Sequence, residues 1–280
     1  MIYEINYADD NYKSAQKFNS KMAKKFGVDK IIEYGPEDID EQFKRKNESI
    51  WNNSKGGGYW IWKPYIVKRT LNCVDYGDYI IYMDAGCCLM ADIHILINIM
   101  LRDKIDIMLF DVGVAEKCYS KRDAFILLDC DKPEFTETHQ RLGGYFILRK
   151  CDRSNKFVDE WLYFAQDRRI ITDEDNVMGM PNYDGFVENR HDQTIFSLLS
   201  KKWKIQPYRD PSQYGYMINY DQDILEKSSY LQMIDLHRQG SMPRSYFVYK
   251  YIPRNVYMGG LFRIGRKMLR ACARRFHLIS

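Results

Sequence analysis

The chain has 280 residues, of which 45% are hydrophobic and 29% charged, so collagen, a coiled coil and a largely disordered chain are excluded. No apolar run reaches the roughly 18 residues that a membrane span needs. The net charge of +4 comes from one end: residues 254–280 hold seven Lys or Arg and no Asp or Glu, which leaves 35 basic against 38 acidic residues elsewhere. We therefore expect no nucleic-acid partner.

The seven cysteines are odd in number, and no pair has the spacing CxxC. This pattern favours reduced thiols over a disulfide framework or a zinc site, and reduced thiols are typical of the cytoplasm. The adjacent Cys87 and Cys88 are interpreted as small buried residues rather than as metal ligands.

The chain opens with a strand over residues 1–7, a helix over 12–26 and a strand over 29–34, an order typical of α/β domains. The pattern then predicts further elements in chain order: a helix from Pro64, a strand at 78–83, a helix at 92–102, strands at 105–110 and 144–149, and helices at 155–171 and 191–202. Beyond residue 203 the chain is aromatic-rich and irregular. We expect one mixed α/β domain.

The strand at 78–83 delivers Asp84 into a turn of small residues, Ala85 and Gly86. Ligands of open α/β sheets bind beyond the carboxyl ends of the strands. A carboxylate there suits a cation that carries diphosphate oxygens, or a sugar hydroxyl. A helix cap or a plain turn residue is the structural alternative.

The segment GGGYWIWKP at residues 56–64 combines glycines, aromatic rings and a cation. Its glycine spacing fits neither phosphate-loop motif, so a hinge is the preferred interpretation. Trp60 could stack on a base or a sugar, and Lys63 could meet a diphosphate, whereas Trp62 is expected in the core. A solvated surface position is the alternative for Lys63.

The segment His191-Asp192-Gln193 begins a predicted helix after the long polar loop 172–190. Asp192 is an acceptable helix cap, and this structural interpretation stays open. The functional interpretation makes Asp192 the base that deprotonates an acceptor, gives Gln193 a place on the other face of the donor, and keeps Glu188 as a reserve base. A loop as long as 172–190 is often a lid.

These segments resemble GT-A fold glycosyltransferases, and GGGYWIWKPYIV resembles bacterial capsule and O-antigen sugar transferases. The resemblance covers residues 1–205 and implies a Rossmann-like mixed central sheet flanked by helices. It also implies roles for four groups of residues. Asp9 and Asp10 would lie at the nucleoside, and Asp84 and Gly86 would occupy the Asp-x-Asp position. Gly143, Gly144 and Tyr145 would lie on the acceptor side, and residues 191–194 would close the site.

The chain departs from this family at Gly86, where the second carboxylate of Asp-x-Asp is expected. Two arrangements remain open. Asp84 and His191 share a divalent cation (Mn²⁺ or Mg²⁺), or Lys63 or an arginine neutralises the diphosphate in its place.

In residues 254–280 the basic side chains recur every three or four positions opposite an apolar side. This pattern predicts a basic amphipathic helix on an anionic membrane surface; docking on the domain is the alternative. We therefore expect a glycosyltransferase domain at 1–253 and a membrane-associating tail at 254–280, on the inner face of the plasma membrane. The resemblance implies transfer of a hexose from a nucleotide sugar, with UDP as the expected nucleotide, to a lipid-linked or surface-polysaccharide acceptor. A non-catalytic nucleotide-sugar-binding or scaffolding protein is the alternative.

Overall fold

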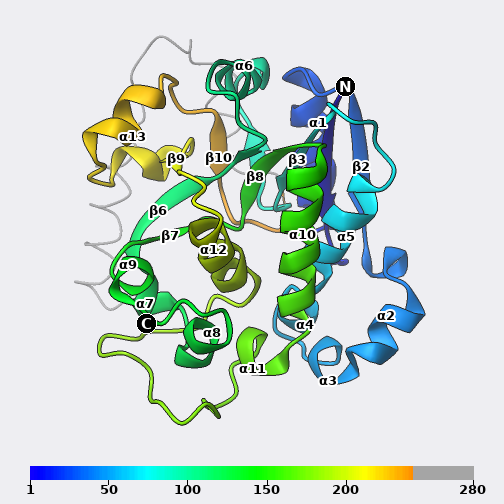
Figure 1. The fold of residues 1–280 in the computed structure, drawn as a ribbon. Coiled ribbons are helices and arrows are strands. Elements are labelled where there is room, and N and C mark those ends of the chain that lie inside the picture. Colours follow the sequence, from blue (N-terminus) through cyan, green and yellow to red (C-terminus); the bar gives the residue numbers. More distant parts are fainter. Residues whose placement is uncertain (242–280) are drawn as a thin grey trace, which may run out of the picture. The chain divides into compact units, whose positions relative to one another are not determined.

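A computed structural model describes residues 1–241 and shows a central mixed sheet of five strands in the order β2-β1-β3-β8-β5 (Figure 1). The strands are β1 (Ile2–Tyr7), β2 (Lys30–Tyr34), β3 (Tyr79–Met83), β5 (Ile107–Met108) and β8 (Tyr145–Arg149). The first three are parallel, whereas β8 runs antiparallel to both of its neighbours. The expected fold class, a mixed α/β sheet flanked by helices, is confirmed.

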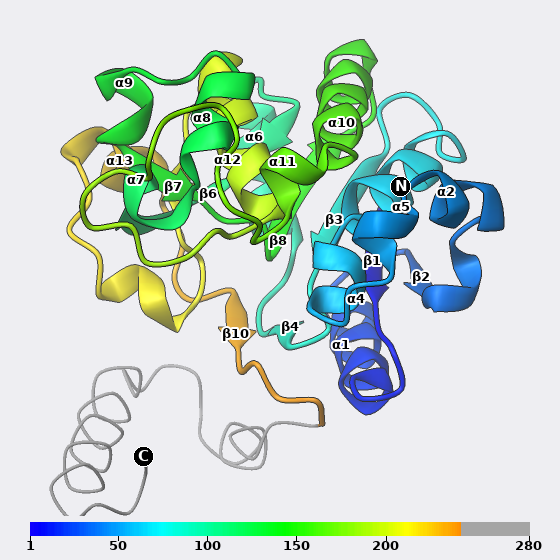
Figure 2. The same cartoon turned by 90° about the horizontal axis from the view of Figure 1, so that it is seen from below.

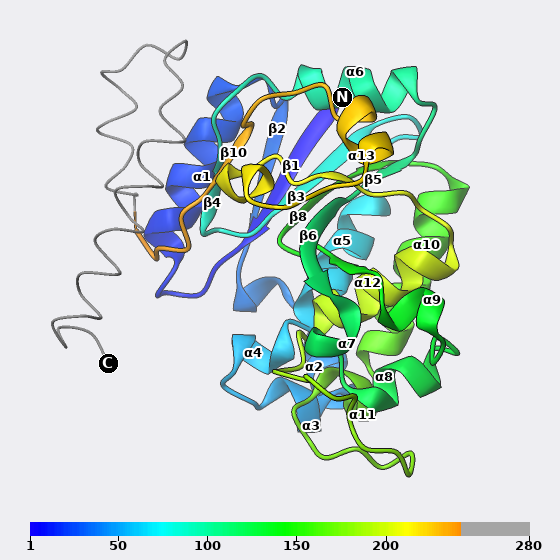
Figure 3. The same cartoon turned by 90° about the vertical axis from the view of Figure 1, so that its left-hand side faces the viewer.

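Helices cover both faces of this sheet, which explains why its central strands are buried along nearly their whole length. Figures 2 and 3 show α1 (Lys13–Lys25) on one side and α5 (Trp62–Leu71), α10 (Asp152–Ala165) and α12 (Asp192–Lys202) on the other. In α10 the buried Phe157, Trp161 and Ala165 recur at helical spacing and form the face turned to the core.

Two smaller sheets extend the domain. One pairs β4 (Cys87–Leu89) with β10 (Ile234–Leu236), and the other has the order β7-β6-β9, formed by β6 (Phe110–Ala115), β7 (His139–Arg141) and β9 (Tyr208–Arg209). The remaining short elements are η1 (Pro36–Asp38), α2 (Glu41–Lys46), α3 (Glu48–Trp51), α4 (Gly56–Tyr59), α6 (His94–Arg102), α7 (Glu116–Tyr119), α8 (Arg122–Leu127), α9 (Pro133–Thr136), α11 (Arg168–Ile171), η2 (Gln213–Tyr216) and α13 (Gln222–Lys227).

Two predicted elements are divided in the structure. The strand expected at 105–110 becomes β5 and β6, because the chain leaves the central sheet after Met108 and joins β7 and β9 from Phe110 onward. The helix expected at 155–171 becomes α10 and α11, because Asp167 is extended and its carboxylate caps α11 through the amide of Arg169. The region beyond 203 also has more regular structure than expected.

The pairing of β3 with β8 places distant residues at one edge of the sheet. Met83 lies opposite Tyr145, so Asp84 directly follows the pair and Gly144 directly precedes it. The amide of Asp84 donates to the carbonyl of Gly144 at 2.8 Å. Since the parallel β1 ends at the same edge, Tyr7 arrives there too.

Within residues 1–241 no helix has the length and apolar character that crossing a bilayer would take. The boundary expected at 253 and the predicted basic helix at 254–280 lie outside the described residues.

Candidate active site

A pocket of about 720 Å³ opens at the carboxyl edge of β1 and β3. This volume lies in the range of small-molecule and cofactor sites. Segments far apart in the sequence line it: the ends of β1 and β3, the glycine-aromatic segment, the start of β8, the approach to α12, and residues 236 and 238. The acidic strand end, the aromatic-lysine segment and the segment before α12 thus share one cavity.

Lys63 lies at the centre of the charged groups. Its ammonium Nζ is 2.8 Å from Oδ2 of Asp192 and 3.4 Å from Oδ1 of Asp84, and it donates to the carbonyl of Gly143 at 3.2 Å. The side chains of Lys63 and Asp192 are 4% and 5% exposed, whereas that of Asp84 is 39% exposed. The alternative of a solvated surface lysine is therefore wrong.

Burial and charge act in opposite directions on the pKa values of this cluster. Burial lowers the pKa of Lys63, but the attraction of Asp192 and Asp84 outweighs it and the pKa is raised. Burial raises the pKa of Asp192 to about 6, although Lys63 opposes the shift. Apart from the ion pair with Lys63, Oδ2 of Asp192 has no partner among the described residues. Asp192 is therefore a buried carboxylate whose pKa is raised to about 6.

Two glycines let the site close tightly around Asp84 and Gln193. A Cβ on Gly144 would lie 3.1 Å from Oδ2 of Asp84, and a Cβ on Gly143 would lie 3.0 Å from Cβ of Gln193. The hydroxyl of Tyr82 donates to Oδ1 of Asp84 at 2.5 Å. Packing against Asp84 and Gln193 therefore explains the glycines at 143 and 144, independently of any ligand.

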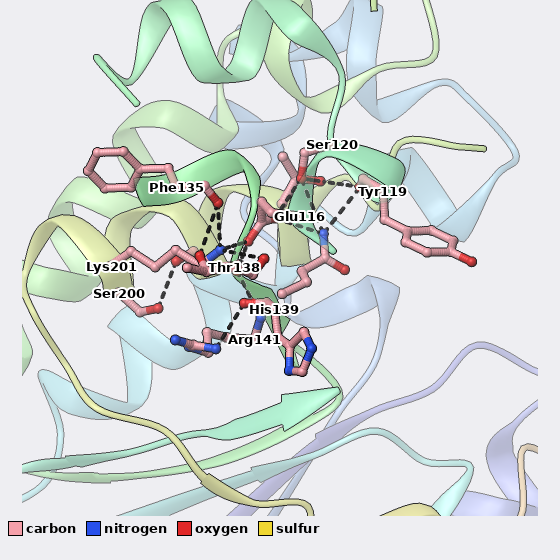
Figure 4. A network of polar contacts seen from close by, with 12 residues as sticks. Glu116, Tyr119, Ser120, Phe135, Thr138, His139, Arg141, Ser200 and Lys201 are labelled. Atoms are coloured by element: carbon pink, nitrogen blue, oxygen red, sulfur yellow. Dashed lines mark hydrogen bonds and ion pairs between the residues drawn. The ribbon is translucent and has the colours of Figure 1, made fainter. Parts of the chain in front are cut away.

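Gln193 is held by a chain of hydrogen bonds that leads into the interior. Its Oε1 accepts from the amide of Gly143 at 2.9 Å, and its Nε2 donates to Oε1 of Gln140 at 2.7 Å. Gln140 donates in turn to the fully buried carboxylate of Glu116, which also pairs with Lys201 at 2.7 Å (Figure 4). The orientation of the Gln193 amide is therefore fixed.

Aromatic rings form one wall of the pocket. Tyr7 stacks on Trp62 with ring centroids 3.7 Å apart and an angle of 14° between the planes. Trp60 stacks on His191 at 5.3 Å. Trp62 is buried as expected for a core residue, yet it also lines the pocket. The wall offers flat apolar surfaces to a base or a sugar ring.

Strained backbone is concentrated around the pocket. Seven described residues other than glycine have positive φ, and Lys104, Asp129 and Lys204 follow helix ends, where this conformation is common. The other four surround the pocket: Tyr59, Trp60, His191 and Arg238. Together with Gly56, Gly57 and Gly58, the chain has five consecutive residues of positive φ. Such strain persists only where the surroundings enforce it and is typical of functional sites.

The pocket gathers most of the site residues expected from the sequence. Its walls include the following of them: Asp9, Trp60, Lys63, Asp84, Gly86, Gly144, Tyr145, Glu188, His191, Asp192 and Gln193. Gly143 touches Lys63 and Gln193 from behind. Asp10 is exposed and is not among the lining residues, while the carboxylate of Asp9 caps the following turn through the amides of Asn11 and Tyr12.

His191 is turned away from the arrangement in which it would share a cation with Asp84. Its Nδ1 is 2.7 Å from the carbonyl oxygen of Ile171, and its Nε2 is 3.6 Å from Oδ1 of Asp173. The ring packs between Tyr59 and Trp60. Burial lowers the pKa of His191, so the ring is neutral near pH 7.

Sequence reasoning missed Tyr7, Arg190 and Arg238, which line the same pocket. Tyr7 is the last residue of β1 and could have been found from the rule that ligands bind at strand ends. Arg190 directly precedes the predicted trio. Arg238 carries no local signal, because only the antiparallel pairing of β10 with β4 brings it beside Gly86.

The loop 172–190 lines a second pocket of about 690 Å³, and Glu188 and Asn189 line both pockets. Buried Asp123 holds the loop, since its carboxylate accepts from the amides of Val177 and Met178 at 2.7 and 3.1 Å. The loop expected to be a lid therefore borders the site.

The sequence matches no protein-family model, and a search of curated proteins found no match. Solved structures with a similar fold include three glycosyltransferases. They are the bifunctional enzyme WbbM (10% identity, 86% of this chain and 46% of that one, TM-score 0.46), the galactosyltransferase LgtC (13%, 83% and 86%, 0.45) and GlyE of Streptococcus pneumoniae (14%, 94% and 63%, 0.43). The chain spans less than half of the WbbM chain.

Proposed function

We propose that the chain is a glycosyltransferase that moves a hexose from a nucleotide sugar, UDP-linked by resemblance, to a glycan acceptor. The observation that carries this proposal is the convergence of Asp84, Lys63 and Asp192 in one pocket that has an aromatic wall. The wall suits the base, and the charged cluster lies at the sheet edge where donors of α/β folds bind.

In the proposed reaction Asp192 acts as the base. It takes the proton of the acceptor hydroxyl while that oxygen bonds to the anomeric carbon, and the bond from this carbon to the diphosphate breaks, so that a nucleoside diphosphate leaves. The pKa of about 6 supports this role, because the carboxylate is charged at neutral pH and still basic enough to accept a proton. Gln193, held at both ends of its amide, is a polar stabiliser in this scheme rather than a nucleophile.

The second pocket supports an acceptor site. It shares Glu188 and Asn189 with the donor pocket, and amide and carboxylate side chains dominate its lining, which suits the hydroxyl groups of a glycan. The proposed acceptor is a lipid-linked or surface polysaccharide at the inner face of the plasma membrane. This location rests on the basic pattern of residues 254–280.

The test is a panel of nucleotide sugars, read first as thermal stabilisation and then as release of nucleoside diphosphate. A ligand that binds only the folded state raises its melting temperature. Asp84→Ala should lose this activity. Asp159→Ala, which removes a carboxylate from an exposed ion pair with Lys68 on the protein surface, should keep it.

The outcomes distinguish a catalytic glycosyltransferase from a protein that only binds nucleotide sugars. Stabilisation by a nucleotide sugar without turnover, also in the presence of oligosaccharide acceptors, would favour the non-catalytic alternative. The absence of stabilisation by every nucleotide sugar would contradict the proposed function.

A further inference from the structure

The position of Lys63 determines whether this pocket can hold a divalent cation. Two carboxylates on neighbouring elements are a common way to hold a metal ion. Here the space between Asp84 and Asp192 contains an ammonium group that contacts both, at 3.4 and 2.8 Å. A metal at this place would have to displace a buried cation from its partners.

The donor set for a metal is also incomplete. Among residues 1–241 no group of three or more His, Cys, Asp or Glu side chains is placed to hold a metal ion. His191 has its ring nitrogens turned to Ile171 and Asp173. Besides Asp84 and Asp192, the acidic side chains that line the pocket within the described residues are Asp9 and Glu188, and neither forms an ion pair with Lys63.

The backbone of Arg238 lies against Gly86, the position where the family has its second carboxylate. The amide of Arg238 donates to the carbonyl of Gly86 at 2.8 Å, and a Cβ built on Gly86 would lie 3.1 Å from the Cα of Arg238. A side chain at 86 would therefore press on the backbone of Arg238, which would have to move by a few tenths of an ångström. The glycine allows the close approach of Arg238.

Arg238 differs from the other cations of the pocket. Lys63 pairs with Asp192, Lys55 with Asp173 at 2.7 Å, and Arg190 with Glu188 at 3.7 Å. Within the described part of the chain, Arg238 has no carboxylate partner; it is exposed and lies over the ring of Tyr214. A guanidinium in this state can bind two phosphate oxygens at once.

We propose that this chain binds the diphosphate of its donor without a divalent cation. Lys63 occupies the place between Asp84 and Asp192 where a metal would bridge them, and Arg238, seated on Gly86, binds the phosphate oxygens. This inference rests on the proposed function and adds the ionic chemistry of the same site.

The first experiment measures binding of UDP to the full chain by calorimetry, in EDTA and again in excess Mn²⁺. We expect dissociation constants that agree within about twofold. Binding that requires Mn²⁺ would overturn the inference and leave the proposed function intact. If none of UDP, GDP, dTDP and ADP binds in either buffer, the proposed function fails together with the inference.

The second experiment follows free Mn²⁺ by electron paramagnetic resonance. The wild-type chain should leave the signal of free Mn²⁺ unchanged, because an ammonium lies between the two carboxylates and the donor set is incomplete. Mn²⁺ binding by the wild type would overturn the inference.

The third experiment addresses Arg238, whose exposed side chain can be removed with little risk to folding. Arg238→Ala should weaken UDP binding in EDTA about tenfold to hundredfold, as expected for a lost charged hydrogen bond. Arg149→Ala removes an exposed arginine at the opposite end of β8 and should leave the affinity unchanged. Equal affinities for the wild type and Arg238→Ala would overturn the assignment of Arg238.

Discussion

Residues 1–241 contain two buried lysine–carboxylate pairs, and the pairs differ in which hydrogen-bonding groups remain unsatisfied. In the interior pair, Lys201 also donates to the carbonyls of Phe135 and Thr138, and Glu116 also accepts from Ser120, Gln140 and Ser197. Figure 4 shows Lys201 and Glu116 together with Ser120, Phe135 and Thr138.

At the pocket, Lys63 joins one buried and one half-exposed carboxylate, and among the described residues Oδ2 of Asp192 has the ion pair as its sole polar contact. The pKa values differ in direction. Burial lowers the pKa of Lys201 despite Glu116, whereas the two carboxylates raise that of Lys63. A saturated pair stabilises one conformation, and an unsaturated pair beside a cavity keeps capacity for a ligand or a proton.

The strongest test of this contrast removes one carboxylate from each pair. Asp192→Asn should lower kcat by about 10² to 10⁴, the usual contribution of a general base. Glu116→Gln should reduce the melting temperature but change the kcat of the folded fraction far less. The measurement is the initial rate at saturating donor, divided by the concentration of folded protein. Equal losses of kcat would show that the two pairs do not differ in role.

Removing the lysines tests the stability side of the comparison. Lys63→Met and Lys201→Met should each lower the free energy of unfolding by about 3–5 kcal/mol, because each leaves a buried carboxylate unpaired. In urea unfolding, the double variant Lys63→Met/Asp192→Asn should recover part of the loss, since no buried charge is then left. Recovery of transfer activity in the double variant would contradict the assignment of Asp192 as the base.

The pH profile sharpens the contrast further. With a pKa of about 6, Asp192 is protonated below that value and cannot accept a proton. We expect kcat/KM to fall about tenfold per pH unit below 6 and to be level above it. In Asp192→Asn this limb should vanish from the residual activity, while Glu116→Gln should retain it.

The smallest expected effect concerns the aromatic wall. Tyr7→Ala removes the ring stacked on Trp62 and should raise KM for the donor up to about tenfold, with kcat little changed. Tyr163→Ala, at a tyrosine that is 72% exposed, is the matched control and should leave KM unaltered. A decrease in kcat alone would place Tyr7 with the reacting groups instead of the wall.

The sequence predicted the central sheet and several site residues because both depend on local patterns. Buried strands and helical spacing are readable over six to fifteen residues, and a carboxylate at a strand end marks a site by position. The buried partnership of Lys63 was not readable, since it depends on how α5 and α12 meet over the sheet.

Arg238 and Gln140 were not predictable for the same reason. Arg238 reaches the pocket through a short antiparallel strand late in the chain, and Gln140 lies behind the pocket, where it accepts from Gln193 and Arg190. The division of the strand at 105–110 was also hidden, because its apolar run continues while the chain changes sheets. Strand pairing between residues far apart in the sequence is not indicated by any local sequence pattern.

The turn at residues 56–60 has a consequence for efforts to alter this protein. Tyr59 and Trp60 already adopt a conformation that costs side-chain-bearing residues about 1–2 kcal/mol each, and a Cβ on Gly58 would lie 2.9 Å from the Cα of Trp51. In a saturation library, the three glycine codons should be nearly invariant among functional clones. Engineering of a new donor specificity should therefore substitute the aromatic side chains that the turn presents and leave the glycines of the turn unchanged.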